Sequence, residues 1–89
     1  MRAVITVVGK DAVGILAKVS ARCSDHNVNV LEVTQSIVQD VFAMIMMVDI
    51  SKCDIPFTQL VDVMMDLGKE NGLVIHCMHE DIFDAMHTI

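Results

Sequence analysis

The first third of this 89-residue chain constrains its fold more than any other stretch. The apolar run Val4–Val8 predicts a strand, which stops at a turn bracketed by Gly9 and Gly14. Apolar residues then repeat at helical spacing within Ile15–His26, and strand-like sequence returns at Asn27–Leu31. Such a unit aims the unpaired amides of a helix N-terminus at the mouth of the turn, where a small anion can bind.

Hydrophobic periodicity and turn residues predict the remaining elements of the chain. In chain order these are a strand at Val28–Ile37, a hairpin connection at Val38–Asp40, a strand at Val41–Ile50, a helix opened by Asp54–Pro56 and ended by Asn71–Gly72, a strand at Leu73–Met78 and a short helix in the tail Glu80–Ile89. Asp is a favoured capping residue and Pro is tolerated in a first turn. We therefore expect Asp54 to cap the second helix, and Asp11 or the residues just after it to cap the first.

This order of elements is the split βαβ pattern. It predicts an α+β, ferredoxin-like βαββαβ sandwich, in which a four-stranded antiparallel sheet has its first and third strands in the centre and both helices on one face. We expect residues 1–89 to form a single domain, with a core at 1–79 and a short C-terminal helical tail at 80–89.

The third predicted strand, Val41–Ile50, is apolar on both of its faces. A single layer of two helices covers only one face of a sheet, so the other face must meet the tail, another subunit, or both. The hydrophobic fraction of 54% is high for a chain of this size, which has little interior in which to bury it. We therefore expect a homodimer or a higher homo-oligomer.

Composition narrows the classes of partner and compartment. The formal net charge of −6 and the lack of Trp and Tyr argue against nucleic-acid binding. No apolar run reaches the roughly 18 residues of a membrane span, and the start shows no leader pattern, so we expect a cytoplasmic protein that binds no membrane. The three cysteines, Cys23, Cys53 and Cys77, show no paired spacing and predict neither a disulfide framework nor a thiolate metal site.

Catalytic and metal-binding patterns are weak in this sequence. Ser20 and Ser24 have only His26 nearby in sequence and no oriented base, and no Arg stands in the first turn for an acylphosphatase-like reaction. The C-terminal histidines His76, His79 and His87 lack a tight ligand spacing. We predict no catalytic residue, no metal site and no cofactor, and interpret the chain as a non-enzyme.

The residues quoted above resemble the ACT domain family. The turn and helix start Lys10–Leu16, the strand entry Asn27–Val30 and the β-β-α-β second half carry the resemblance, which extends to about Met78. The ending His79–His87 is similar to that of small stand-alone bacterial ACT proteins related to the regulator of the glycine cleavage system. The resemblance implies a regulatory domain that binds a small effector, commonly an amino acid, at the interface of two domains paired side by side, and that signals to a separate protein partner.

The serine-binding form found on phosphoglycerate dehydrogenases takes its contacts from the first turn and the start of the second strand. Carried over by resemblance, the ligand-binding positions of this chain are Asp11, Ala12, Val13, Gly14, Ile15, Leu16, Asn29 and Val30. The effector's carboxylate would meet the amides of Val13–Leu16, and Asp11 and Asn29 would hold its polar groups. That form has a His where this chain has Gly9, so the resemblance does not carry a serine preference.

Two other interpretations stay open from the residues alone. In the first, Asp11 serves only as a helix cap; in the second, Asn29 serves only as an anchor of the helix-to-strand turn. The chain would then be a dimerisation or protein-interaction module that binds no metabolite, which the apolar second face of the sheet and the missing His also favour.

Overall fold

The computed structural model describes residues 1–10 and 13–87. Its elements are β1 at Arg2–Gly9, α1 at Ile15–Asp25, β2 at Asn29–Val38, β3 at Val41–Asp49, α2 at Phe57–Glu70, β4 at Val74–His79 and α3 at Glu80–His87. The predicted βαββαβ order is confirmed, and the tail forms the expected helix.

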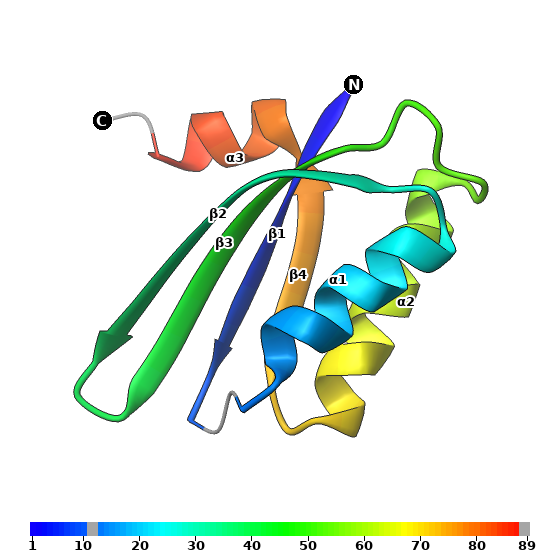
Figure 1. The fold of residues 1–89 in the computed structure, drawn as a ribbon. Coiled ribbons are helices and arrows are strands. Elements are labelled where there is room, and N and C mark those ends of the chain that lie inside the picture. Colours follow the sequence, from blue (N-terminus) through cyan, green and yellow to red (C-terminus); the bar gives the residue numbers. More distant parts are fainter. Residues whose placement is uncertain (11–12, 88–89) are drawn as a thin grey trace.

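The four strands form one antiparallel sheet in the order β2-β3-β1-β4, so the first and third strands are central as predicted. Helices α1 and α2 lie side by side over one face of this sheet (Figure 1). Alternate strand residues such as Ile5 and Met46 point to that face and pack against Val19 of α1 and Leu60 of α2, all four fully buried. The helices thus close a two-layer core.

Within residues 1–10 and 13–87, the opposite face of the sheet is covered at one end and open at the other. Val4 and Arg2 point to it, and Arg2 forms an ion pair with Glu80 at the start of α3, with Nη2 and Oε2 2.8 Å apart. Since α3 packs on β1 and β4, we attribute the complete burial of Val4 to this helix. Val8, Ile45 and Val74 remain partly exposed on the same face. The tail therefore covers part of the second apolar face, as one of the expected alternatives requires.

The turns explain why the elements end where they do. Gln39, with φ 57°, forms the two-residue connection between β2 and β3 with Asp40, in agreement with the predicted hairpin. Helix α2 ends at Glu70, and Gly72 follows in the left-handed region at φ 68°, which glycine adopts without steric cost.

The predicted cap of α2 is wrong. Pro56, not Asp54, occupies the N-cap position, and no side chain caps the helix. The Asp54 carboxylate instead contacts the His26 ring, with Oδ1 and Nδ1 3.0 Å apart. The Asp54 backbone amide donates to the His26 carbonyl at 3.1 Å. Asp54 therefore joins the end of α1 to the loop before α2.

Candidate effector site

The turn before α1 has the backbone geometry that its glycine predicts. Gly14 occupies the N-cap position at φ 73° and ψ 5°, a left-handed conformation that other L-residues seldom adopt. The Lys18 amide donates to the Gly14 carbonyl at 3.1 Å and closes the first helical turn. The amides that precede Lys18 in this turn lie outside the intrahelical ladder, and no acidic side chain stands in the first turn. The end of the helix is thus favourable for an anion.

The predicted turn residues have unequal environments. Asp11 and Ala12 lie outside the described residues. Val13 is 90% exposed, Ile15 is buried, and Leu16 packs against the core from a half-buried position. Among the described residues, no side chain makes a capping hydrogen bond at Gly14. Ile15 can therefore meet a ligand only through its backbone.

Asn29 and Val30 begin β2 at the other end of α1. Val30 packs against the core, whereas Asn29 is exposed, pairs in register with Asp49, and makes no side-chain hydrogen bond with any described residue. The helix-to-strand turn is closed by backbone bonds instead, including the Val28 amide to the Cys23 carbonyl at 2.8 Å. The anchoring role that Asn29 might have had is therefore taken by the main chain.

One copy of the chain does not bring these two groups of predicted residues together. Helix α1 has eleven residues between the turn and β2, a length of about 16 Å. The turn lies at the same end of the sheet as the β2–β3 hairpin, and Asn29 lies at the opposite end (Figure 1). The two groups are therefore separated by the length of α1 within one copy of the chain.

A cavity of about 300 Å³ lies where the turn meets the hairpin. Lys10 and Val13 line it from the turn, and Ile37, Asp40 and Phe42 line it from the hairpin. A smaller hollow of about 120 Å³ lies beside it, on the side of α1. The sequence did not predict that hairpin residues border the turn, because this contact depends on the strand order.

Lys18 and Asn71 line the smaller hollow together with Val13. The Lys18 ammonium donates to Asn71 Oδ1 at 2.7 Å, and Nδ2 of the same Asn71 side chain donates to the Leu67 carbonyl at 2.8 Å. The helical spacing within Ile15–His26 predicts Lys18 on the solvent face of α1, and the structure confirms that Lys18 is exposed. Because Lys18 follows Gly14 by one helical turn, its side chain leans back toward the turn, and the sequence could have predicted a cation there.

The missing histidine of the serine-binding form has a steric explanation. A β-carbon built at Gly9 would lie 1.9 Å from Cδ2 of Leu73, whose side chain is buried beneath the strand. In this chain, the Leu73 side chain occupies the space that a side chain at position 9 would need. The first turn therefore has no room for a ligand contact from residue 9 unless Leu73 moves.

Comparison with known proteins decides the family. The family model described as "ACT domain" matches residues 2–78. The chain belongs to the ACT domain family. This ACT domain is 47% identical over 88 residues to a UPF0237 protein of Bifidobacterium longum, with 99% of this chain and 98% of that one covered. It is 39% identical to a UPF0237 protein of Methanopyrus kandleri, with the same coverage, so its relatives include archaeal as well as bacterial proteins.

Solved structures agree on the fold. An ACT domain protein from Streptococcus pneumoniae superposes with a TM-score of 0.82 at 30% identity, covering 100% of this chain and 97% of that one. A putative glycine cleavage system transcriptional repressor superposes with a TM-score of 0.72 at 22% identity, covering 85% of this chain and 43% of that one. The family is typically regulatory rather than catalytic. Within the described residues, no helix has both the length and the apolar character to span a membrane.

Proposed function

We propose that this ACT domain is a non-enzymatic metabolite sensor, a homodimer that binds a small effector, an amino acid, where the turn of one copy meets Asn29 of the other. The observation that carries the proposal is that α1 separates the turn residues from Asn29 and Val30, which lie at opposite ends of the sheet. The edge strand β2 runs from one of these ends to the other. Antiparallel pairing of two β2 strands would place the start of one beside the end of the other. Asn29 of the second copy would then lie near the cavity between the turn and the hairpin.

The exposure of β2 supports this pairing. Eight of its ten residues are exposed, and its outer edge has no neighbour in the sheet. A long exposed edge strand pairs readily with another strand unless charges or proline protect it. Glu32 is the only charged residue of β2, which contains no proline. Side-by-side pairing would join two sheets into one of eight strands.

The proposed mechanism uses the N-terminus of α1, the Lys18 cation and the predicted contact at Asp11. The effector's carboxylate would bind the α1 amides near Gly14, with Lys18 adding positive charge, and Asp11 would receive its ammonium group. Asn29 from the other copy would bind a remaining polar group. An effector held by both copies stabilises the dimer relative to separate chains, and a protein partner that distinguishes these states receives the signal.

A mixing experiment tests the shared site. Thermal unfolding is followed against a panel of the proteinogenic amino acids at fixed protein concentration, and the one giving the largest stabilisation is used for binding. Asp11→Ala and Asn29→Ala should each abolish its binding, whereas Thr34→Ala, at another exposed polar position of β2, should not. When the two defective variants are unfolded and refolded together, half of the dimers are mixed, and each has one intact site of two. Binding should return to about a quarter of the wild-type number of sites.

No recovery in the mixture would contradict a site built from two copies. A folded dimer that responds to no amino acid would overturn the sensor and favour the rival function, a protein-interaction module without an effector. The partly exposed apolar residues Val8, Ile45 and Val74 on the second face of the sheet support that rival.

A further inference from the structure

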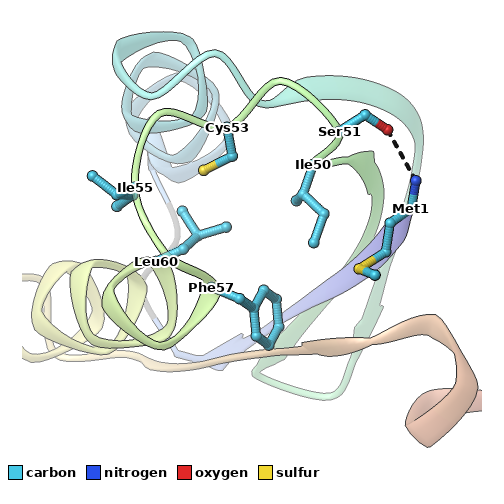
Figure 2. Close-up of a pocket in the computed structure, with 7 residues that line it drawn as sticks. All are labelled: Met1, Ile50, Ser51, Cys53, Ile55, Phe57 and Leu60. Atoms are coloured by element: carbon cyan, nitrogen blue, oxygen red, sulfur yellow. Dashed lines mark hydrogen bonds between the residues drawn. The ribbon is translucent and has the colours of Figure 1, made fainter.

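The loop between β3 and α2 borders two cavities at the end of the sheet opposite the turn. One cavity, of about 330 Å³, is apolar, with Ile50, Phe57 and Leu60 among the side chains that line it (Figure 2). Its polar side chain, Ser51, donates to Asp49 Oδ1 at 2.6 Å. The other cavity, of about 460 Å³, lies at the start of β2 and is lined mainly by polar residues. We call it the β2 cavity, and its polar groups are the ones that can recognise a ligand.

Five polar side chains from three segments of the chain meet at the β2 cavity. They are Ser20 and Ser24 on α1, Asn27 and Asn29 at the entry to β2, and Lys52 in the β3–α2 loop. Ser20 and Ser24 are one helical turn apart, so they share a face of α1. Val28 and Val30 also line the cavity, and both pack against the core. The cavity therefore combines polar groups with two apolar side chains, as small-molecule sites usually do.

The polar side chains of the β2 cavity have no partner in the described part of the chain. None of the five makes a side-chain hydrogen bond or an ion pair there. Nearby polar groups differ, because Asp54 contacts the His26 ring and Asp49 accepts two hydrogen bonds from Ser51. Lys52 contributes least to the lowered pKa of Asp49. The Lys52 ammonium therefore keeps its donors for a ligand.

The groups at the β2 cavity are suited to a negatively charged oxygen of a ligand. Each of the five side chains can donate a hydrogen bond, and Lys52 brings a positive charge. None of the described residues that line the cavity is acidic, although the whole chain has a formal net charge of −6. A carboxylate accepts charge-assisted hydrogen bonds from such a set, whereas a neutral amide accepts weaker ones.

We propose that the effector is an amino acid with an acidic side chain, and that Lys52 binds its side-chain carboxylate. This inference rests on the proposed function, in which Asn29 of one copy meets the turn of the other. Asn29 lines the β2 cavity, so an effector held at Asn29 can extend its side chain toward Lys52. The side-chain methylenes would contact Val28 and Val30, and the α-carboxylate would remain at the α1 amides of the other copy.

The panel of proteinogenic amino acids gives the first test. Aspartate or glutamate should stabilise the protein most against thermal unfolding. Isothermal titration calorimetry then compares that acid with its uncharged amide, asparagine or glutamine, which has nearly the same shape. We expect the acid to bind about tenfold more tightly, because hydrogen bonds to a charged group are stronger than those between neutral groups. This advantage should shrink at high ionic strength, since Lys52 is exposed to solvent.

Matched lysine variants locate the group that selects the acid. Lys52→Met keeps the length of the side chain and removes its charge, so the acid should lose about tenfold in affinity while the amide binds as before. Lys69→Met, at the exposed end of α2, should leave both affinities unchanged. Both lysines are exposed, so neither substitution should unfold the chain, and cooperative thermal unfolding checks this.

Three results would overturn the inference and leave the proposed function standing. The first is a panel in which a neutral or basic amino acid stabilises the protein most. The second is equal affinity for the acid and its amide. The third is an unchanged preference for the acid in the folded Lys52→Met variant. A dimer that responds to no amino acid overturns the proposed function itself, so the panel distinguishes the two failures.

Discussion

The two ends of the sheet are built in opposite ways. The turn end, defined by Lys10–Gly14 and the hairpin residues Ile37–Phe42, has a cavity between exposed segments and is bordered by Lys10 and Asp40. The loop end, defined by Met1 and Ile50–Phe57, has a cavity whose floor is Leu60 of the core. The turn-end cavity can be completed by a second copy, whereas the apolar cavity at the loop end is complete within one.

This difference follows from where the helices stop covering the sheet. The β2–β3 hairpin extends beyond α1, and Ile37 and Val38 at its tip are 73% and 66% exposed (Figure 1). At the loop end, α2 begins directly after the β3–α2 loop and its first turn enters the core. The same fold therefore has an exposed hairpin tip at one end and a half-open apolar cavity at the other.

The largest expected effect tests the rigidity of the loop end. Leu60→Ala removes a fully buried side chain, and we expect unfolding free energy to fall by about 2–5 kcal/mol. Val13→Ala at the turn end should change it by less than about 0.5 kcal/mol, because Val13 is 90% exposed. Urea unfolding of both variants measures the difference. Similar losses in the two variants would contradict the contrast between the ends.

A smaller effect tests how closely the turn end packs below its surface. Gly9→Ala would place a β-carbon 1.9 Å from Leu73 Cδ2, and we expect a loss of about 1–3 kcal/mol from overpacking. In a Leu73→Ala background, the same change at Gly9 should cost much less, since the obstructing atoms are gone. A double-mutant cycle by thermal unfolding measures this coupling, and additive losses would argue against a direct contact.

The third prediction concerns the thiols gathered at the loop end. Burial raises the pKa of Cys23 from 9.0 to about 11 and that of Cys77 from 9.0 to about 12. The folded state therefore retains protons that the unfolded state loses above pH 9, so the contribution of these two thiols to stability should be constant below pH 9 and should fall between about pH 9 and pH 12. Cys77→Val should flatten this alkaline decline in urea unfolding at a series of pH values. An equally steep decline in the variant would contradict it.

The smallest expected effect concerns the ion pair that ties the loop to α1. Asp54→Ala removes the contact with His26, whose side chain is 24% exposed beside the 50% exposed carboxylate, so stability should fall by no more than about 1 kcal/mol. The loop should open more often, and Cys53 should react faster with N-ethylmaleimide. Asp25→Ala, on the solvent face of α1, is a matched control. An unchanged rate in Asp54→Ala would show that the backbone bonds alone hold the loop.

Local pattern was sufficient for the elements and insufficient for the contacts between them. Apolar spacing around Val19 and Leu60 and the turn residues Gly14 and Gly72 predicted helices and turns that the structure confirms. The prediction that Asp54 caps α2 was wrong because it considered only neighbouring residues such as Pro56. The actual partner of Asp54 is His26, which lies 28 residues away in the sequence. Capping preference decides only among local partners.

The candidate sites show the same limit. Lys18 is exposed, as the helical pattern predicts, but that pattern does not predict its bond to Asn71, which is 53 residues later in the chain. Cys23, Cys53 and Cys77 are far apart in sequence, but they lie close enough for Cys53 and Cys23 to raise the pKa of Cys77. The apolar cavity at the loop end brings residue 1 beside residues 50–60, which no periodicity predicts. Such juxtapositions follow from the strand order rather than from any single segment.

The contact between Gly9 and Leu73 bears on which pairs of residues an ACT domain can carry at these two positions. A lineage that acquires a histidine at position 9 before residue 73 shrinks passes through a destabilised intermediate, because the two side chains compete for one space. A lineage that replaces Leu73 with a smaller residue first passes through an intermediate with a destabilising cavity. Positions 9 and 73 are therefore expected to covary, and a chain that has Gly9 with Leu73 is separated from the histidine form by two substitutions, each unfavourable alone.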